Sequence, residues 1–152
     1  MSVDTPQHPD GTAAALNSLV LIRRADADDA AFVFSYWLRD HFEHSAFARG
    51  VSKDTYMRLH HLVLERVIAR SCIWVACDAE DPSVLYGFIC AEGDILHYLF
   101  VKRRFRGLGI GGRLLAEAGF SATGPKLFTH LTDSMIRLRQ RWPLAEYSPY
   151  HL

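Results

Sequence analysis

The chain has little of several features that would place it in a specialised class of protein. No apolar run reaches the roughly 18 residues that suggest a membrane-spanning helix, and the start lacks the basic-then-apolar order of a secretory signal. An excess of charge of one sign is also missing, because 17 Lys and Arg balance 17 Asp and Glu. No overall field therefore favours nucleic acid or an anionic membrane. We expect a cytoplasmic protein with no membrane partner and with nucleic acid not favoured.

Cysteine is scarce too, with only Cys72, Cys77 and Cys90 in the chain. All three fall in apolar, strand-like runs. Four residues separate Cys72 from Cys77, which is neither a zinc-knuckle nor a redox spacing. We interpret the three thiols as small core side chains in a reducing compartment.

Histidine is more frequent, with eight in the chain, and raises the question of a metal. The pairs His41/His44 and His60/His61 lack the cysteine or carboxylate neighbours of a zinc site. On a helix, His60 borders the apolar stripe and His61 faces away, so these two do not chelate together easily. We therefore expect no metal site.

Apolar periodicity and helix or turn signals predict a single domain over residues 19–152, after a polar, disordered leader over residues 1–18. The first expected elements are a strand at 19–24, a helix capped by Asp26 that frays at Asp40 into a loop ending at Gly50, and a helix capped by Ser52. Strands follow at 72–77, 85–91 and 95–101. The last expected elements are a helix at 114–120, a strand at 126–131 and a short helix that ends before Pro143. This order predicts an α/β fold whose middle strands form an antiparallel meander.

The segment from Lys102 to Leu115 is the most informative part of the chain. It reads KRRFRGLGIGGRLL, follows the apolar run 95–101 and leads into the predicted helix at 114–120. A strand that ends in glycines at the start of a helix presents several N–H groups to one point, where the helix dipole adds positive potential. Glycine also lets a diphosphate approach the backbone closely, and the arginines add charge-assisted contacts. The segment therefore predicts a site for a phosphate-bearing cofactor.

Two common phosphate-binding motifs do not fit this context. A dinucleotide-binding domain places its glycines after the first strand, with an acidic residue about 20 residues later. Here the glycines follow the fourth predicted strand. A P-loop requires Gly-Lys-Ser/Thr, which the chain does not contain.

The segment Arg106-Gly107-Leu108-Gly109-Ile110-Gly111, followed by Leu114-Leu115, resembles the acetyl-CoA signature Gln/Arg-x-x-Gly-x-Gly/Ala of the Gcn5-related N-acetyltransferase (GNAT) superfamily. Together with the element order, the resemblance covers roughly residues 19–131. It implies a GNAT-like mixed, mostly antiparallel sheet with a truncated C-terminal part. A fainter likeness through residues 47–50 and His60-His61 points to members carried by bacteriophages and prophages.

The resemblance implies acetyl-CoA as co-substrate and assigns residues to it. The pantetheine arm would pair with the strand edge at Phe100 and Val101, which requires the strand at 126–131 to splay away. The diphosphate would be held by backbone N–H groups of Arg106, Gly107, Leu108, Gly109, Ile110, Gly111 and Gly112.

Acyl transfer also needs a general base for the amine. Many family members carry a glutamate on the strand before the cofactor loop. Here the chain offers His97, which has the same strand parity as Val101 and an imidazole pKa suited to the task. A buried, structural histidine is the alternative.

The leaving thiolate needs a proton donor, and here the chain departs from the family. The helix that usually carries an acidic tyrosine reads TDSMIRLRQR over residues 132–141, without tyrosine. Tyr147 or Tyr150 in the tail could take that role. The alternative is that they anchor the C-terminus on the core.

The resemblance implies that the loop from Asp40 to Gly50 roofs the acceptor site, where Asp40, His41, Glu43 and His44 could receive a cationic amine. A solvated helix end is the alternative. We therefore predict transfer of an acetyl group, in a ternary complex, to a primary amine of a small molecule or a protein. Two alternatives stay open: a non-catalytic protein that binds CoA or a partner, and a phage-type enzyme that modifies a nucleobase. A homodimer is compatible with the sequence.

Overall fold

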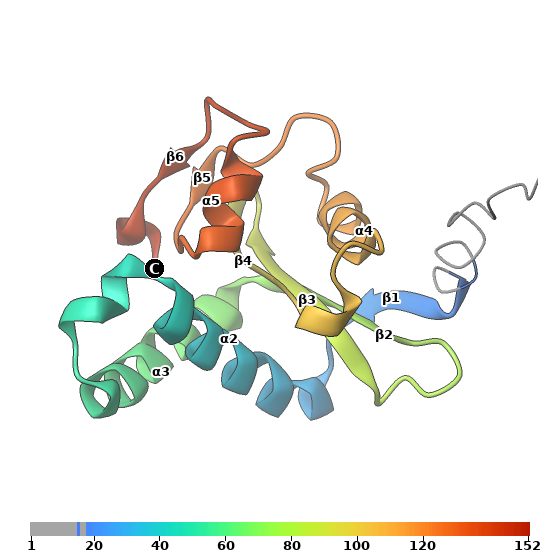
Figure 1. Ribbon diagram of the computed structural model, residues 1–152, viewed down its shortest axis with the longest axis horizontal. Helices are drawn as coiled ribbons and strands as arrows, with labels where there is room; N and C mark the ends of the chain where they lie inside the picture. Colours follow the sequence, from blue (N-terminus) through green and yellow to red (C-terminus); the bar gives the residue numbers. More distant parts are fainter. Residues whose placement is uncertain (1–14, 16–17) are drawn as a thin grey trace, which may run out of the picture.

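The computed structural model describes residue 15 and residues 18–152, so the expected leader over residues 1–18 lies almost wholly outside the described residues. A six-stranded sheet runs through the domain in the order β1-β2-β3-β4-β5-β6 (Figure 1). Its strands are β1 (Val20–Arg24), β2 (Cys72–Asp78), β3 (Leu85–Glu92), β4 (Ile95–Val101), β5 (Leu127–Phe128) and β6 (Glu146–Tyr147). The first four pair antiparallel, whereas β5 and β6 join in parallel. The predicted α/β fold with a mixed, mostly antiparallel sheet is confirmed.

Helices cover both faces of this sheet (Figure 1). The α-helices are α2 (Ala30–His44), α3 (Lys53–Arg70), α4 (Ile110–Glu117) and α5 (Asp133–Arg139), and the 3₁₀ helices are η1 (Ala27–Asp29), η2 (Ala46–Gly50), η3 (Arg103–Phe105) and η4 (Pro149–His151). Within the part of the chain that the structure describes, no helix is long and apolar enough to cross a membrane.

Two apolar cores lie on opposite faces of the sheet because neighbouring strand residues point to opposite sides. On β3, Ile89 packs in the core beneath α4, while Phe88 packs with α2 and α3. Trp37 of α2 and Leu64 of α3 are fully buried in the second core. Burial of each such side chain contributes about 1.5–3 kcal/mol to the free energy of unfolding. This burial holds the two helices against the sheet.

The first helix differs from the prediction at both ends. Asp26 and Asp29 form the expected capping box, but on the 3₁₀ turn η1, and α2 begins only at Ala30. Instead of fraying at Asp40, α2 continues to His44. Its last turn stays helical because it packs on α3: the His41 ring is buried and lies 5.9 Å from that of Tyr56.

The predicted strand at 126–131 is shorter than expected. β5 has only Leu127 and Phe128, and the side chains of Thr129 and His130 are buried and bonded to each other instead of extending the ladder. The two-residue strand β6 was not predicted. It joins β5 through a hydrogen bond from the N–H of Ser148 to the carbonyl of Phe128.

β4 and β5 pair only at Ile95 with Leu127 and at Leu96 with Phe128, and then separate. The splay required for a free edge on β4 is therefore present. β4 also contains a bulge, because Tyr98 pairs with Cys90 and Leu96 pairs with Ala91, which leaves His97 without a partner in the ladder. The bulge lies where the two strands part.

Candidate functional site

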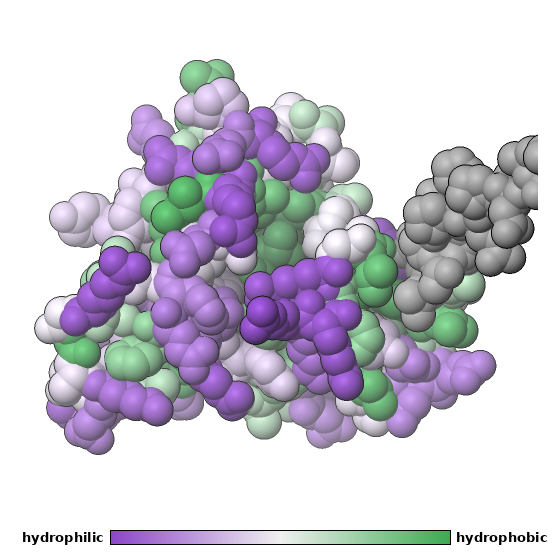
Figure 2. All heavy atoms as spheres, viewed as in Figure 1, coloured by the Kyte–Doolittle hydropathy of each residue, from purple (hydrophilic) through white to green (hydrophobic). Residues whose placement is uncertain are grey.

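A hollow of about 210 Å³ lies where β4 has lost its neighbour, between this strand, α4 and α5. In Figure 2, recessed apolar (green) surface is visible near the centre of the face, bordered by hydrophilic (purple) side chains. The residues that line this donor hollow are Asp40, Leu99, Val101, Phe105, Arg106, Gly107, Gly109, Ile110, Gly111, Ser134, Met135 and Leu138. Six of the nine residues expected to contact the cofactor are among them; Phe100, Leu108 and Gly112 are not.

The glycine segment opens this hollow to the start of α4. Gly107 and Gly109 adopt φ angles of +78° and +83°, in the region that favours glycine. Gly109 is the N-cap of α4, and no side chain among the described residues caps the helix there. The space that a Cβ of Gly107 or Gly109 would occupy has no atom within 4 Å. The first N–H groups of α4 and this open space fit a diphosphate at the helix N-terminus.

The free edge of β4 forms the opposite wall. The N–H of Lys102 donates to the carbonyl of Tyr86 on β3, and Phe100 pairs with Phe88. In an antiparallel ladder, alternate residues direct their backbone groups to opposite sides. Leu99 and Val101 therefore present theirs to the free edge, which fits an extended arm added as a strand.

This register bears on Phe100, which was expected to pair with the pantetheine arm at the strand edge. Its backbone is directed to β3, where its carbonyl oxygen would lie only 2.4 Å from a Cβ on Gly87. Glycine is needed at position 87 for that close approach. The aromatic side chain of Phe100 packs in the core with α2 and borders the second hollow described next. Leu99 and Val101, and not Phe100, direct their backbone groups to the free edge of β4.

A second, wider hollow of about 880 Å³ lies on the α2 side. Its lining residues are Tyr36, Arg39, Asp40, Glu43, His44, Phe100, Lys102, Arg103, Arg104 and Arg106. Five of these are Lys or Arg and two are carboxylates, so this acceptor hollow is cationic with a local anionic region on α2. The ammonium of Lys102 lies 5.1 Å from the ring centre of Phe32, and burial together with Arg104 lowers its pKa.

Asp40 and Arg106 border both hollows. The Asp40 carboxylate accepts a 2.6 Å hydrogen bond from the hydroxyl of Tyr98, and Nδ1 of His44 lies 3.2 Å from its Oδ1. Burial, followed by the Asp40 charge and hydrogen bond, raises the pKa of Tyr98 well above its usual value. Tyr98 therefore stays protonated and holds Asp40 in place. Sequence analysis missed this pair, since the two residues are 58 positions apart.

His97 lies away from the two hollows, and its side chain is fully buried. Nδ1 lies 2.8 Å from the Thr129 hydroxyl, and Nε2 lies 3.0 Å from a carboxylate oxygen of Glu92. Burial lowers the pKa of His97 although Glu92 acts to raise it. His97 is the unpaired residue of the bulge, which breaks the strand alternation that it was predicted to share with Val101. Its role as the base stays a prediction.

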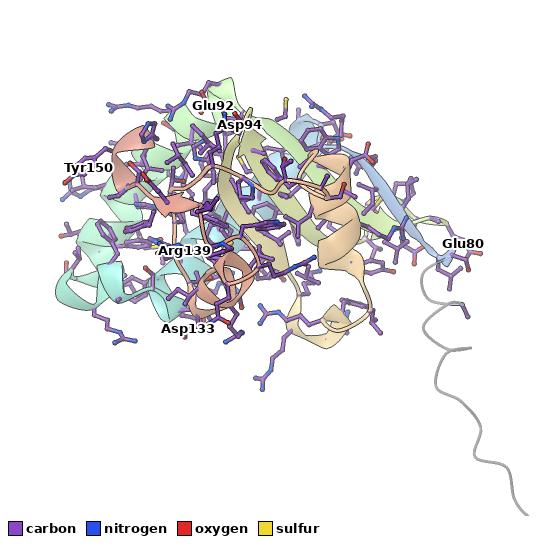
Figure 3. The ribbon with its side chains drawn as sticks, turned by 90° about the horizontal axis from the view of Figure 1, so that it is seen from above. Glu80, Glu92, Asp94, Asp133, Arg139 and Tyr150 are labelled. Atoms are coloured by element: carbon purple, nitrogen blue, oxygen red, sulfur yellow. The ribbon has the colours of Figure 1, made fainter. Side chains whose placement is uncertain are left out.

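The two tail tyrosines also stay predictions as proton donors. Tyr147 lies on β6 with 39% of its surface exposed, and Tyr150 is 92% exposed on η4 at the periphery (Figure 3). Neither is among the described residues that line the two hollows. Burial raises the pKa of Tyr147.

Comparisons with known proteins find similarity of shape only. No family model matches it, and no curated protein matches it either. Among solved structures, it is similar to apo YjaB from Escherichia coli, with 22% identity, a TM-score of 0.48 and coverage of 66% of this chain and 64% of that one. An acetyltransferase of the GNAT family from Staphylococcus aureus Mu50 gives 17% identity, a TM-score of 0.46 and coverage of 65% and 63%. In each of these two comparisons, the match covers less than two thirds of the length of the other protein.

A third similar structure contains the cofactor. It is the aminoglycoside N-acetyltransferase AAC(6')-Iy in complex with CoA, at 16% identity and a TM-score of 0.43, covering 80% of this chain and 85% of that one. Identities and scores of this size do not transfer an activity. A function of the chain is therefore inferred from the site itself.

Proposed function

We propose that this chain is an acetyl-CoA-dependent N-acetyltransferase that transfers the acetyl group directly to a primary amine. One observation carries the proposal: the free edge of β4 and the glycine-opened start of α4 line the same hollow. Coenzyme A has a diphosphate at one end and an amide-bearing arm at the other. The diphosphate matches the glycine-opened start of α4, and the amide-bearing arm matches the free edge of β4.

The donor hollow would bind the cofactor through its backbone. N–H groups from Gly107 to Gly111 would contact the diphosphate, and the backbone of Leu99 and Val101 would pair with the arm. In the structure, Nε of Arg106 donates to the Val101 carbonyl at 2.8 Å. Pairing with the arm would require this side chain to turn away, which would free its guanidinium for phosphate.

The acceptor hollow would bind an amine that also carries an anionic group. Asp40 and Glu43 would receive the ammonium, and the basic side chains that follow β4 would receive the anion. A simple polycation fits poorly, because five basic side chains line this hollow. The charges of the lining residues therefore narrow the predicted acceptor to amines that also carry an anionic group.

We assign the role of general base to Asp40, which borders both hollows. Bound acetyl-CoA supplies an acetyl group activated as a thioester. Asp40, at the boundary of the hollows, would remove the proton from the ammonium, directly or through one water molecule. The nitrogen–carbon bond would then form and the carbon–sulfur bond would break; the nitrogen would lose its second proton, and the leaving sulfur would take up one proton. Tyr98 acts as a positioning residue, because its hydroxyl fixes the carboxylate that it bonds.

The basic lining favours one second candidate, an amine on a nucleotide or nucleic acid. Lys102, Arg103 and Arg104 lie in succession beside the hollow, where phosphates could bind. Such an acceptor predicts binding that weakens steeply with added salt. A small zwitterionic amine predicts a weaker dependence.

Release of free CoA thiol tests the proposal directly. The protein is incubated with acetyl-CoA and a panel of amines that includes amino acids, phosphorylated amines, polyamines and single-stranded oligonucleotides. We expect turnover with amines that carry an anion, with polyamines slower. CoA binding without turnover on any acceptor would instead support the non-catalytic alternative.

A further inference from the structure

Three histidines from distant parts of the chain meet in the interior. They are His41 on α2, His60 on α3 and His130 just after β5, with exposed fractions of 3%, 6% and 1%. One ring nitrogen of each lies within 4.8 Å of the other two. The Nε2 atoms of His60 and His130 are 2.9 Å apart. This three-histidine cluster is separate from the residues that line the donor and acceptor hollows.

Hydrogen bonds on the outer side orient two of the rings. The Tyr56 hydroxyl donates to the Leu38 carbonyl at 2.9 Å, so it accepts a hydrogen from Nδ1 of His41 at 3.1 Å. That tautomer leaves Nε2 of His41 with a free lone pair. The other ring nitrogen of His130, Nδ1, lies 3.1 Å from the Thr129 hydroxyl. Histidines that bind metals usually have their second nitrogen fixed by a partner in this way.

The surroundings keep the imidazoles neutral, which is the form that binds metals. Burial lowers the pKa of His41 to about 3 and that of His60 to about 4. Aromatic rings enclose the cluster, with Trp37 5.1 Å and Tyr98 5.7 Å from the His130 ring. In the neutral form, the facing Nε2 atoms of His60 and His130 share one hydrogen.

The geometry points to a divalent transition-metal site, and we propose that His41, His60 and His130 bind Zn²⁺. Tetrahedral zinc holds imidazole nitrogens about 2.0–2.1 Å from the metal, which places them about 3.3 Å apart. Here one pair of nitrogens is 2.9 Å apart and all three lie within 4.8 Å of one another, so modest shifts of the rings would bring them to that spacing. An all-imidazole set excludes Mg²⁺ and Ca²⁺, which require oxygen ligands. Among the described residues, the group holds no fourth protein ligand, so water would complete it.

The ion would join the parts of the fold that support the acceptor hollow. It would tie α2 to α3 and to the segment that follows β5, close to where β4 and β5 part. His41 directly follows Asp40, and Tyr98, which bonds Asp40, packs 6.3 Å from the His41 ring. Because the three ligands come together only in the folded chain, the metal stabilises the native state.

Local sequence does not indicate this site, because its three histidines are far apart in the chain. Along the sequence, His41 is near His44 and His60 is next to His61, whereas His130 has no neighbouring histidine. The structure instead combines one member of each pair with His130. The prediction of no metal site was drawn from the neighbouring pairs and does not test this three-histidine cluster.

Cobalt substitution of the untagged protein tests the site. The purified chain is stripped with a chelator and titrated with Co²⁺, which gives intense visible bands in a tetrahedral site. We expect one equivalent of Co²⁺ to bind, Zn²⁺ to displace it, and Zn²⁺ to raise the melting temperature. His60→Gln should lose the bands and the thermal shift. His61→Gln is the matched control, since His61 is the exposed neighbour bonded to Glu65, and should keep both.

A measurement on the unaltered protein covers the case in which His60→Gln does not fold. X-ray absorption at the zinc edge should show three imidazole ligands and no sulfur. Sulfur ligands would indicate binding at the cysteines instead. Fewer than three imidazoles, absence of stoichiometric binding, or unchanged cobalt bands in a folded His60→Gln would each overturn the proposal.

Discussion

Arg106 and Asp40 face each other across the boundary between the donor and acceptor hollows, with Nη2 and Oδ1 3.9 Å apart. Arg106 belongs to the glycine segment and Asp40 to α2, so the contact links the two parts of the site. A cation and an anion at this point can each contact the molecule bound on either side. The reaction that we propose would take place between them.

Asp40→Asn should reduce turnover without weakening CoA binding. The amide keeps the shape of the side chain but cannot remove a proton, and loss of a general base typically lowers kcat by about 10²–10⁴-fold. Thiol release and calorimetric titration with CoA measure the two effects. The control is Asp54→Asn, the same change at an exposed site on α3. An Asp40 variant with unchanged kcat would remove Asp40 from the mechanism.

Asp29→Asn should flatten the acid limb of the stability curve. Burial acts to raise the pKa of Asp29, but hydrogen bonds from Arg23, at 2.7 and 3.0 Å, and from the Asp26 N–H outweigh it and lower that pKa. The pair therefore stabilises the native state above the unfolded pKa of about 3.9, and this stabilisation is lost as the pH falls through the lower folded value. At neutral pH the variant should lose about 3 kcal/mol.

Urea unfolding between neutral pH and about pH 2 measures the effect of Asp29. Asp28→Asn is the control, because Asp28 lies on the same 3₁₀ turn but is exposed, and it should keep the wild-type slope. A wild-type slope in Asp29→Asn would contradict the depressed pKa.

Gly87→Ala should destabilise the sheet beneath the site. A Cβ at this position would lie 2.4 Å from the Phe100 carbonyl oxygen, so β3 or β4 would have to shift. Overpacking of this kind costs about 1–3 kcal/mol. Gly50→Ala, where a Cβ meets nothing within 4 Å, should change the free energy of unfolding by less than about 0.5 kcal/mol. Equal stability of the two variants in thermal unfolding would refute the packing argument.

Local signals in the sequence predicted most of the fold. Ser52 caps α3 as expected, with its hydroxyl accepting from the N–H of Thr55, and the glycine segment leads into α4. These features depend on residues a few positions apart, which periodicity and capping rules describe well. The glycine segment that lines part of the donor hollow is one continuous stretch, so its position before α4 was predictable for the same reason.

Long-range geometry was not predictable in the same way. The bulge at His97 breaks the alternation along β4, and nothing in the local sequence marks it. Phe100 was assigned to the cofactor because the sequence does not tell which alternate residues face the free edge. The contact of Tyr98 with Asp40 depends on how α2 crosses the sheet. The bulge at His97, the orientation of Phe100 and the contact of Tyr98 with Asp40 all depend on how the helices and strands pack.

CoA affinity of Gly109→Glu tests the central claim most directly. The carboxylate would enter the open space at the start of α4 and repel a diphosphate, so the Kd for CoA should rise more than about 100-fold, or about 2.7 kcal/mol. Gly119→Glu is the matched control, because its φ of +86° is close to the +83° of Gly109 and it also has nothing within 4 Å. Both carry the same backbone strain, at opposite ends of α4. We predict that calorimetry shows CoA binding lost in Gly109→Glu and kept in Gly119→Glu; wild-type affinity in a folded Gly109→Glu would contradict the account.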